Sequence, residues 1–276
     1  VCARSCNYCG LRAPNSRVNR YRMPPDEIVD LAVSLNSKGL KTIVLQSGED
    51  PYYTGEIIAD IVRRIKAQTD TAITLCVGER PYDDYRMWKK AGADRYLLRH
   101  ETASRELYTA LHPDSDFDNR MRCLNWLRDL GYQVGAGCMV GAPGQTVEHM
   151  ADDIEFFRDF QPDMAGIGPY IPHPDTPFAG SSAGTVEMTA TTAIGSIDEL
   201  GREMALQAGA DVVMPNYTPL KYRENYEIYP NKRCISEDPE HCHSCMRLRI
   251  QSIGRTVSTG YGHSRKQPVS GSGVSG

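Results

Sequence analysis

The sequence predicts an α/β protein whose parallel strands and helices form a closed or nearly closed barrel. Short apolar runs rich in β-branched residues alternate along the chain with longer amphipathic segments. Apolar runs of this kind are typical of strands buried on both faces, and their alternation with helices indicates βαβ units. Six to seven such units in 276 residues favour a (β/α) TIM-type barrel over a doubly wound open sheet, which stays the alternative.

Six segments are predicted as strands, at residues 42–46, 72–77, 95–99, 133–140, 164–168 and 211–214. Most are followed within two residues by glycine or proline, which commonly end strands. Polar residues come next, among them Glu49, Glu79 and Glu101. Because residues at the carboxyl ends of barrel strands face the active site, we expect the site among these side chains.

Six further segments show helical periodicity, at residues 24–37, 56–67, 83–91, 118–130, 147–160 and 198–208. In the first of them, Ile28, Leu31 and Leu35 recur at the spacing of one helix face. Gly39 follows, as is typical of a helix carboxyl end. These segments are predicted to be the crossover helices of the barrel.

The composition excludes several classes of protein. Apolar residues make up 40 % and charged residues 24 % of the chain, as in ordinary globular proteins, and the net charge of −4 shows no excess for binding nucleic acid. No apolar run reaches the ~18 residues of a membrane span, and no secretory signal is visible. Nine cysteines, six of them in two clusters, indicate metal ligands in a reducing compartment, so we expect a cytoplasmic protein.

The first cluster is Cys2, Cys6 and Cys9, with the spacing C-x3-C-x2-C. Three thiolates this close in sequence can each bind one iron of a 4Fe-4S cluster and leave the fourth iron open to a small chelating molecule. The alternative is a zinc loop that waits for a distant fourth ligand. Zinc sites more often use paired C-x2-C units, which makes the iron–sulfur interpretation the stronger one.

With the aromatic Tyr8 before its last cysteine, this motif resembles the signature of the radical S-adenosylmethionine (SAM) enzymes. The resemblance implies a barrel fold and a cluster that donates one electron to bound SAM, yielding methionine and a 5′-deoxyadenosyl radical. Residues 96–102, 135–141 and 171–177 resemble one subgroup, the FeFe-hydrogenase maturases of the HydE type, relatives of biotin synthase and methylornithine synthase. The resemblance extends from Cys2 to about Gly262.

The resemblance also implies which residues surround SAM. They are Tyr8, Gln46, Ser47, Gly48, Glu101, Arg120 and Met164. The stretch 45–51 lies where the family carries the Gly-Gly-Glu element that binds the SAM amino group. Glu101 and Arg120 are expected at the ribose and carboxylate, groups that a carboxylate and a guanidinium bind well, and Met164 against the adenine.

By the same resemblance, a substrate cavity is lined by Arg95, Arg99, Thr191, Thr192, Met214, Tyr226 and Tyr229. Arg95 and Arg99 are four residues apart, so on a strand both point to the same side. Two buried arginines are costly unless they are paired, which favours an anionic ligand. The alternatives are that these arginines pair with Glu49, Asp50 or Glu79, or form a rim salt bridge with Glu101.

The implied function is a step in assembly of the hydrogenase di-iron centre. The adenosyl radical would act on an iron–carbonyl–cyanide cysteine complex, with the other hydrogenase maturation proteins as partners and no nucleic acid or membrane involved. The residues alone support only a small, anionic, sulfur-containing ligand. A methylornithine-synthase-like or biotin-synthase-like enzyme and a non-enzymatic Fe–S carrier are the alternatives.

The second cluster, Cys234, Cys242 and Cys245, has the spacing C-x7-C-x2-C and is predicted to hold an auxiliary Fe–S cluster. A zinc site completed by His241 or His243 is the alternative. The three remaining cysteines, Cys76, Cys123 and Cys138, are expected in the core. His112 is expected on the surface of a helix.

Two features of the chain depart from the family pattern. The family has a strand before its first cysteine, and residues 178–193 are too few for a crossover helix and a strand. We expect the natural protein to contain both the strand before the first cysteine and the missing helix within residues 178–193. A barrel without its first strand would have an open edge. Residues 1–262 are predicted to form one barrel domain that includes the cysteine cluster at 234–245, and the Ser/Gly-rich residues 263–276 a flexible tail.

Overall fold

The computed structural model of the protein describes residues 1–182, 194–230 and 239–264. Five parallel strands form one sheet in the order of the chain: β1 (Thr42–Gln46), β2 (Ala72–Cys76), β3 (Arg95–Leu97), β4 (Gln133–Ala136) and β6 (Met164–Ala165). Two short strands, β5 (Met139–Val140) and β7 (Gly168–Pro169), pair in parallel just beyond β4 and β6. The prediction of a parallel α/β architecture of the barrel type is confirmed.

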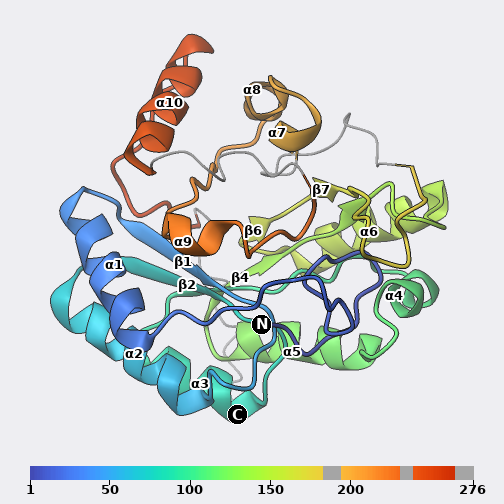
Figure 1. Ribbon diagram of the computed structural model, residues 1–276, viewed down its shortest axis with the longest axis horizontal. Coiled ribbons are helices and arrows are strands. Elements are labelled where there is room, and N and C mark those ends of the chain that lie inside the picture. The colour runs from blue at the N-terminus through green and yellow to red at the C-terminus, as the bar shows by residue number, and fades with distance from the viewer. Residues whose placement is uncertain (183–193, 231–238, 265–276) are drawn as a thin grey trace, which may run out of the picture.

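Five longer helices cover the outer face of this curved sheet (Figure 1). They are α1 (Pro25–Ser37), α2 (Gly55–Gln68), α3 (Tyr82–Ala91), α5 (Phe117–Asp129) and α6 (Val147–Phe160). Their bounds lie within one residue of the predicted ones. Local signals explain this agreement: the Thr54 side chain accepts a hydrogen bond from the Ile57 amide at the start of α2, and Gly92 ends α3 with φ 109°.

The sequence prediction was wrong at several elements of the carboxyl-terminal half. Residues 211–214 form no strand, and Val212 is 65 % exposed, because this run passes over the surface after α8 (Gly201–Gln207) without pairing to the sheet. The predicted helix at 198–208 is present in shortened form as α8. Four helices were missed: α4 (Arg105–Leu111), α7 (Ile194–Ile197), α9 (Leu220–Arg223) and α10 (Pro239–Ser252).

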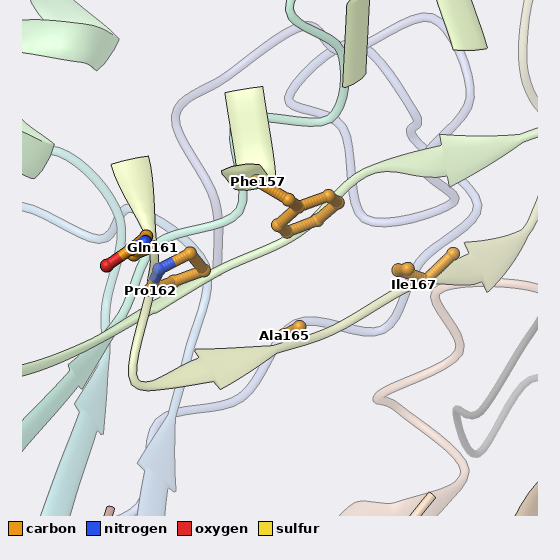
Figure 2. A pocket seen from close by; sticks show the side chains of 5 residues that line it. All are labelled: Phe157, Gln161, Pro162, Ala165 and Ile167. Carbon is orange, nitrogen blue, oxygen red and sulfur yellow. The ribbon is translucent and has the colours of Figure 1, made fainter. Parts of the chain in front are cut away.

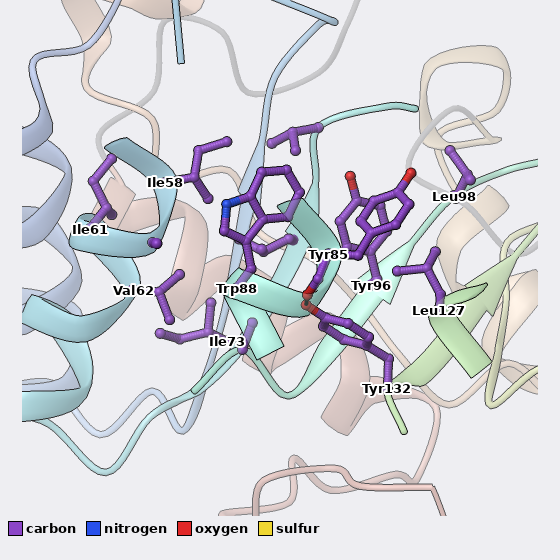
Figure 3. Packing of buried hydrophobic residues seen from close by; sticks show 14 of the residues in the cluster. Ile58, Ile61, Val62, Ile73, Tyr85, Trp88, Tyr96, Leu98, Leu127 and Tyr132 are labelled. Carbon is purple, nitrogen blue, oxygen red and sulfur yellow. Dashed lines mark hydrogen bonds between the residues drawn. The ribbon is translucent and has the colours of Figure 1, made fainter. Parts of the chain in front are cut away.

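The main core lies between the sheet and the helices and is centred on stacked aromatic rings (Figure 3). Trp88 on α3 stacks on Tyr96 of β3 at 6.2 Å between centroids. The hydroxyls of Tyr85 and Tyr96 both donate to the Gly78 carbonyl, at 3.3 and 2.7 Å. Because buried hydroxyls need partners, this core packing also fixes the backbone at the carboxyl end of β2, where Glu79 follows.

No helix in the described part of the chain is long and apolar enough to cross a membrane.

Candidate functional site: a cysteine loop at the strand ends

The amino-terminal cysteine loop crosses the carboxyl ends of the first strands. The amide of Ala3 donates to the Glu49 carbonyl beyond β1 at 2.9 Å, and the amide of Asn7 donates to the carbonyl of Leu111, the last residue of α4, at 2.9 Å. The Arg4 guanidinium pairs with the carboxylates of Glu49 and Glu79. In Figure 1 the same segment, in dark blue, runs past the strand ends towards α4. Cys2, Cys6 and Cys9 therefore lie at the predicted active face.

The three thiols of the loop are free and lie close to one another. Burial, and then negative charge on Cys9 and Cys2, raises the pKa of Cys6, so the three sulfurs are near neighbours. Yet no three His, Cys, Asp or Glu side chains converge on one metal ion in the described residues. Three free thiols on one short loop can each bind a different iron of a cubane.

Close backbone packing holds the loop in place. A Cβ atom at Gly48 would lie 2.6 Å from Cys2 Cβ and 2.6 Å from the Val1 carbonyl. At Gly10 it would lie 2.5 Å from His173 Nε2 and 2.6 Å from the Glu227 carbonyl. Side chains cannot fit at these two contacts without moving the loop. Gly48 thus lies directly against Cys2.

The other residues predicted on this strand end lie at the same edge of the sheet. Gln46 is exposed at the end of β1. The Ser47 amide donates to the Cys76 carbonyl at 3.1 Å, and its hydroxyl donates to the Gly48 carbonyl at 2.7 Å. Cys76, predicted in the core, is only partly buried at the end of β2, because its strand ends at the active face.

Beyond β3, Arg99 and Glu101 form an ion pair at the rim of the barrel, one of the alternatives considered in the sequence analysis. Arg99 Nη2 lies 2.9 Å from Glu101 Oε2 and also donates to the Cys138 carbonyl at 2.7 Å. Glu101 adopts φ 67°, a strained conformation for a residue other than glycine. Two backbone hydrogen bonds hold it: the Glu101 amide donates to the Gly137 carbonyl, and the Met139 amide donates to the Glu101 carbonyl. Arg99 Nε is buried without a hydrogen bond among the described residues, whereas Glu101 Oε2 is held by the ion pair with Arg99. A buried donor left without a hydrogen bond fits a polar ligand.

Arg120 of α5 stands behind this pair and connects it to β2. Its Nε donates to Glu79 Oε1 at 2.6 Å, and its Nη1 donates to the Arg99 carbonyl. Both side chains of the Arg120–Glu79 pair are buried. The sequence had predicted Arg120 at the SAM carboxylate, and the structure places it at the same cluster of charges.

The predicted tyrosines also approach the loop. Burial, and then negative charge on Cys76 and Cys9, raises the pKa of Tyr226 well above its usual value. Burial likewise raises the pKa of Tyr229, and the charge of Arg202, a hydrogen bond with Ser196 and the charge of Arg99 oppose this rise. Met164 lies on β6 opposite Gly135, where an added Cβ would meet its Cε at 2.9 Å. Tyr226 is thus within electrostatic range of Cys76 and Cys9, Tyr229 is within that of Arg99, and Met164 packs on Gly135 of β4.

Arg95 is a correction to the predicted substrate cavity. It begins β3, so it lies at the amino end of the sheet, whereas Arg99 lies beyond the carboxyl end. Its guanidinium donates to Gln133 Oε1 at 3.0 Å, to Thr42 Oγ1 at 3.2 Å and to the Tyr261 carbonyl at 2.7 Å. Two residues four positions apart on a strand point to the same side, but they lie ~13 Å apart along the strand axis. The sequence argument considered the side and overlooked this distance. Arg95 therefore fastens the carboxyl-terminal segment to the barrel.

Several predicted residues do not join the site in the described structure. Met214 is 44 % exposed, because the run that carries it is not a strand. Thr191, Thr192 and Cys234, together with the side chain of Cys242, lie outside the described residues. Cys245 is a partly buried free thiol on α10. His243, a candidate zinc ligand, lies with its Nδ1 2.8 Å from the Tyr217 hydroxyl.

The sequence prediction missed His112. It was expected on a helix surface, but it caps the carboxyl end of α4, is 2 % exposed and lies with Nδ1 3.3 Å from Cys6 Sγ. Since α4 itself was not predicted, nothing in the periodicity could place this histidine. The signal that could have found it is the Ser104 cap that begins α4.

A shallow groove on another part of the surface carries no such chemistry. It is lined by Phe157, Gln161, Pro162, Ala165 and Ile167, where α6 leads into β6 (Figure 2). None of these side chains is a titratable or metal-ligating group. We therefore assign the functional site to the cysteine loop and the strand ends.

The model of the radical SAM superfamily matches residues 1–157. The chain belongs to the radical SAM superfamily, as the cysteine spacing and the parallel sheet had indicated. It is 48 % identical over 279 residues to the [FeFe] hydrogenase maturase subunit HydE of Thermotoga maritima, covering 95 % of this chain and 80 % of that protein. Within the superfamily it is thus a HydE-type radical SAM enzyme, which confirms the predicted subgroup.

More distant relatives agree with this placement. The 3-methylornithine synthase of Methanosarcina acetivorans is 27 % identical over 178 residues, 64 % of this chain and 50 % of that protein. The crystal structure of methylornithine synthase (PylB) matches 93 % of this chain and 80 % of its own with a TM-score of 0.76 at 22 % identity. The maturase HydG from Carboxydothermus hydrogenoformans matches 83 % of this chain and 55 % of its own with a TM-score of 0.60 at 20 % identity. These two structures show the shared fold.

Membership of the superfamily implies a 4Fe-4S cluster and SAM as cofactors. The residues present fit both groups. Three free, neighbouring thiols suit a cubane, and the buried Arg99 Nε, which makes no hydrogen bond among the described residues, suits a polar ligand beside it.

Proposed function

We propose that this chain holds a 4Fe-4S cluster on Cys2, Cys6 and Cys9, cleaves SAM reductively, and acts in the cytoplasm in assembly of the di-iron centre of FeFe hydrogenase. The observation that carries the proposal is the 48 % identity to a HydE maturase over 95 % of the chain, together with the cysteine loop at the strand ends. When bound, the cluster supplies the electron that splits SAM into methionine and a 5′-deoxyadenosyl radical.

The chain's own residues bind and orient SAM in this proposal. The backbone of Gln46, Ser47 and Gly48 receives the amino group next to Cys2. Glu101, which Arg99 holds through an ion pair to Oε2, accepts from the ribose hydroxyls. Arg120, held by Glu79, contributes positive charge towards the SAM carboxylate. Met164 packs against the adenine, and Tyr8 closes the side of the cluster.

The substrate in this proposal is a small, anionic, sulfur-containing iron–cysteine complex. The charge of Arg99 is paired with Glu101, and its buried Nε remains a hydrogen-bond donor for a polar group of the substrate. Tyr226 and Tyr229 offer hydroxyl donors near the thiols and Arg99. Thr191, Thr192 and Met214 remain predicted cavity residues on the resemblance alone, and Arg95 is excluded by its position.

We also propose an auxiliary Fe–S cluster on Cys234, Cys242 and Cys245, resting on their spacing in the sequence. Iron counting on reconstituted protein tests it. About eight irons per chain that fall to about four in Cys242→Ser/Cys245→Ser would support it, since each cubane holds four. About four irons in both proteins would reject it.

Hydrogenase activation tests the assembly role. The chain is co-expressed with an FeFe hydrogenase and the other maturation proteins in a host without its own HydE. Hydrogen production that is lost in Cys6→Ala supports the proposal. Absent hydrogen production alongside intact SAM cleavage would reject the maturation role and favour an amino-acid substrate. Neither activity from a chain that retains iron would favour a non-enzymatic carrier.

A further inference from the structure

The end of α4 clamps the cysteine loop at three points around Cys6. The Asn7 amide donates to the Leu111 carbonyl at 2.9 Å, and the Asn7 side chain donates to the Ala110 carbonyl at 2.9 Å. The third contact is His112 Nδ1, which lies 3.3 Å from Cys6 Sγ. Asn7 is the residue next to Cys6, so its two hydrogen bonds to α4 fix the position of the Cys6 sulfur relative to the imidazole.

The imidazole of His112 is held rigidly. Its backbone amide donates to the Tyr108 carbonyl at 2.8 Å, and its ring stacks on the Tyr108 ring at 4.5 Å between centroids. Tyr8 packs edge-on against the ring at 5.4 Å. Nε2 is buried and has no hydrogen-bond partner in the described chain. The contact with Cys6 is therefore the polar contact that orients the ring.

A thiolate bound to iron carries no proton, so the contact with Cys6 is a hydrogen bond only when Nδ1 carries the hydrogen. Hydrogen bonds to the sulfurs of an Fe–S cluster stabilise its more negative, reduced form and raise its reduction potential. We infer that His112 is a positioning residue that donates from Nδ1 to Cys6 Sγ and tunes the reduction potential of the cluster. This inference rests on the proposed cluster and concerns its electron affinity.

Three substitutions separate the hydrogen bond from ring packing. His112→Phe keeps an aromatic ring against Tyr8 and Tyr108 but removes the donor. His112→Asn places an amide N–H near the position of Nδ1, whereas His112→Gln places it one methylene farther out. His149→Phe on the exposed start of α6 is the matched control. The reduction potential of each reconstituted protein is measured by a redox titration monitored by electron paramagnetic resonance, with iron content determined on the same samples.

We expect the ratio of reduced to oxidised cluster at a fixed potential to fall about tenfold in His112→Phe, a shift of ~59 mV to lower potential. His112→Asn should stay closer to the wild type than His112→Gln, and His149→Phe should match the wild type. Equal potentials in the wild type, His112→Phe and His112→Gln would overturn the inference. If His112→Phe loses its iron, the Asn and Gln variants are compared instead. A potential closer to the wild type in His112→Asn than in His112→Gln supports the inference, and equal potentials in the two variants would overturn it. A wild-type protein that binds no cluster would instead reject the proposed function.

Discussion

Arg120 Nε donates to Glu79 Oε1 at 2.6 Å, and this buried ion pair joins α5 to the carboxyl end of β2 behind the candidate SAM site. The same Glu79 carboxylate accepts from Asn119 at 2.7 Å and pairs with Arg4 of the cysteine loop. A single acidic residue therefore connects the loop that holds the cysteines to Arg120.

Glu79→Gln tests this connection. The substitution keeps the shape of the side chain but leaves the Arg120 charge buried without its partner. Breaking one side of a buried pair costs about 3–5 kcal/mol, so we expect a loss of this size in the free energy of unfolding measured in urea. Asp118→Asn, which removes the exposed partner of Arg105, is the control and should cost less than about 1 kcal/mol. Equal effects of the two substitutions would show that the buried pair does not support the site.

Arg95→Met tests the corrected role of Arg95. The substitution removes three hydrogen bonds that fasten Thr42, Gln133 and the Tyr261 carbonyl at the amino end of the sheet. We expect the free energy of unfolding to fall by about 2–4 kcal/mol. The KM for SAM should be unchanged at a temperature at which the variant is folded. Unchanged stability with impaired turnover would return Arg95 to the substrate cavity.

Gly48→Ala tests the close packing beneath Cys2. The new methyl group would collide with Cys2 Cβ and the Val1 carbonyl, both backbone-proximal atoms that cannot swing away. Forcing a methyl group into such a space costs about 1–3 kcal/mol, so we expect SAM affinity to fall about tenfold or more in a calorimetric titration. Gly180→Ala is the control, because nothing lies within 4 Å of its added Cβ. Unaltered affinity in Gly48→Ala would contradict a close contact between the cysteine loop and the end of β1.

The Arg22–Asp50 pair predicts an acid-sensitive part of the stability. Burial opposes ionisation of Asp50, but hydrogen bonds from Arg22 at 2.7 and 3.0 Å outweigh it, and the pKa of Asp50 is lowered. A lowered pKa contributes stability above the unfolded pKa of about 4, and this contribution is lost as the pH falls through the folded pKa. Below about pH 4, the melting temperature of the wild type should fall more steeply than that of Asp50→Asn. Parallel pH profiles of the two proteins would refute this contribution.

Local patterns predicted the amino-terminal half of the fold well, because each helix and strand there carries its own signal. β1 and α6 have the predicted bounds, since an apolar β-branched run and a Thr146 cap define them locally. The run at 211–214 has the same apolar character as β1 but forms no strand. Whether an apolar run joins a sheet depends on a neighbouring strand edge, which the sequence of the run does not contain.

The site was predicted in part for a related reason. The cysteine motif is local, so the sequence identified Cys2, Cys6 and Cys9 directly. The resemblance assigned Arg95 and Arg99 to the same cavity, and their shared side of a strand agreed with it, whereas the structure separates them along the strand direction. His112 reaches Cys6 across 106 positions of sequence, and no periodicity reports a contact of that range.

SAM cleavage tests the central claim most directly. The chain is reconstituted anaerobically with iron and sulfide, mixed with SAM and dithionite, and 5′-deoxyadenosine is quantified beside a Cys2→Ala/Cys6→Ala/Cys9→Ala variant. We predict product from the wild type and none from the variant. A wild-type protein that binds about four irons but yields no 5′-deoxyadenosine would contradict the claim that this loop supports radical SAM chemistry.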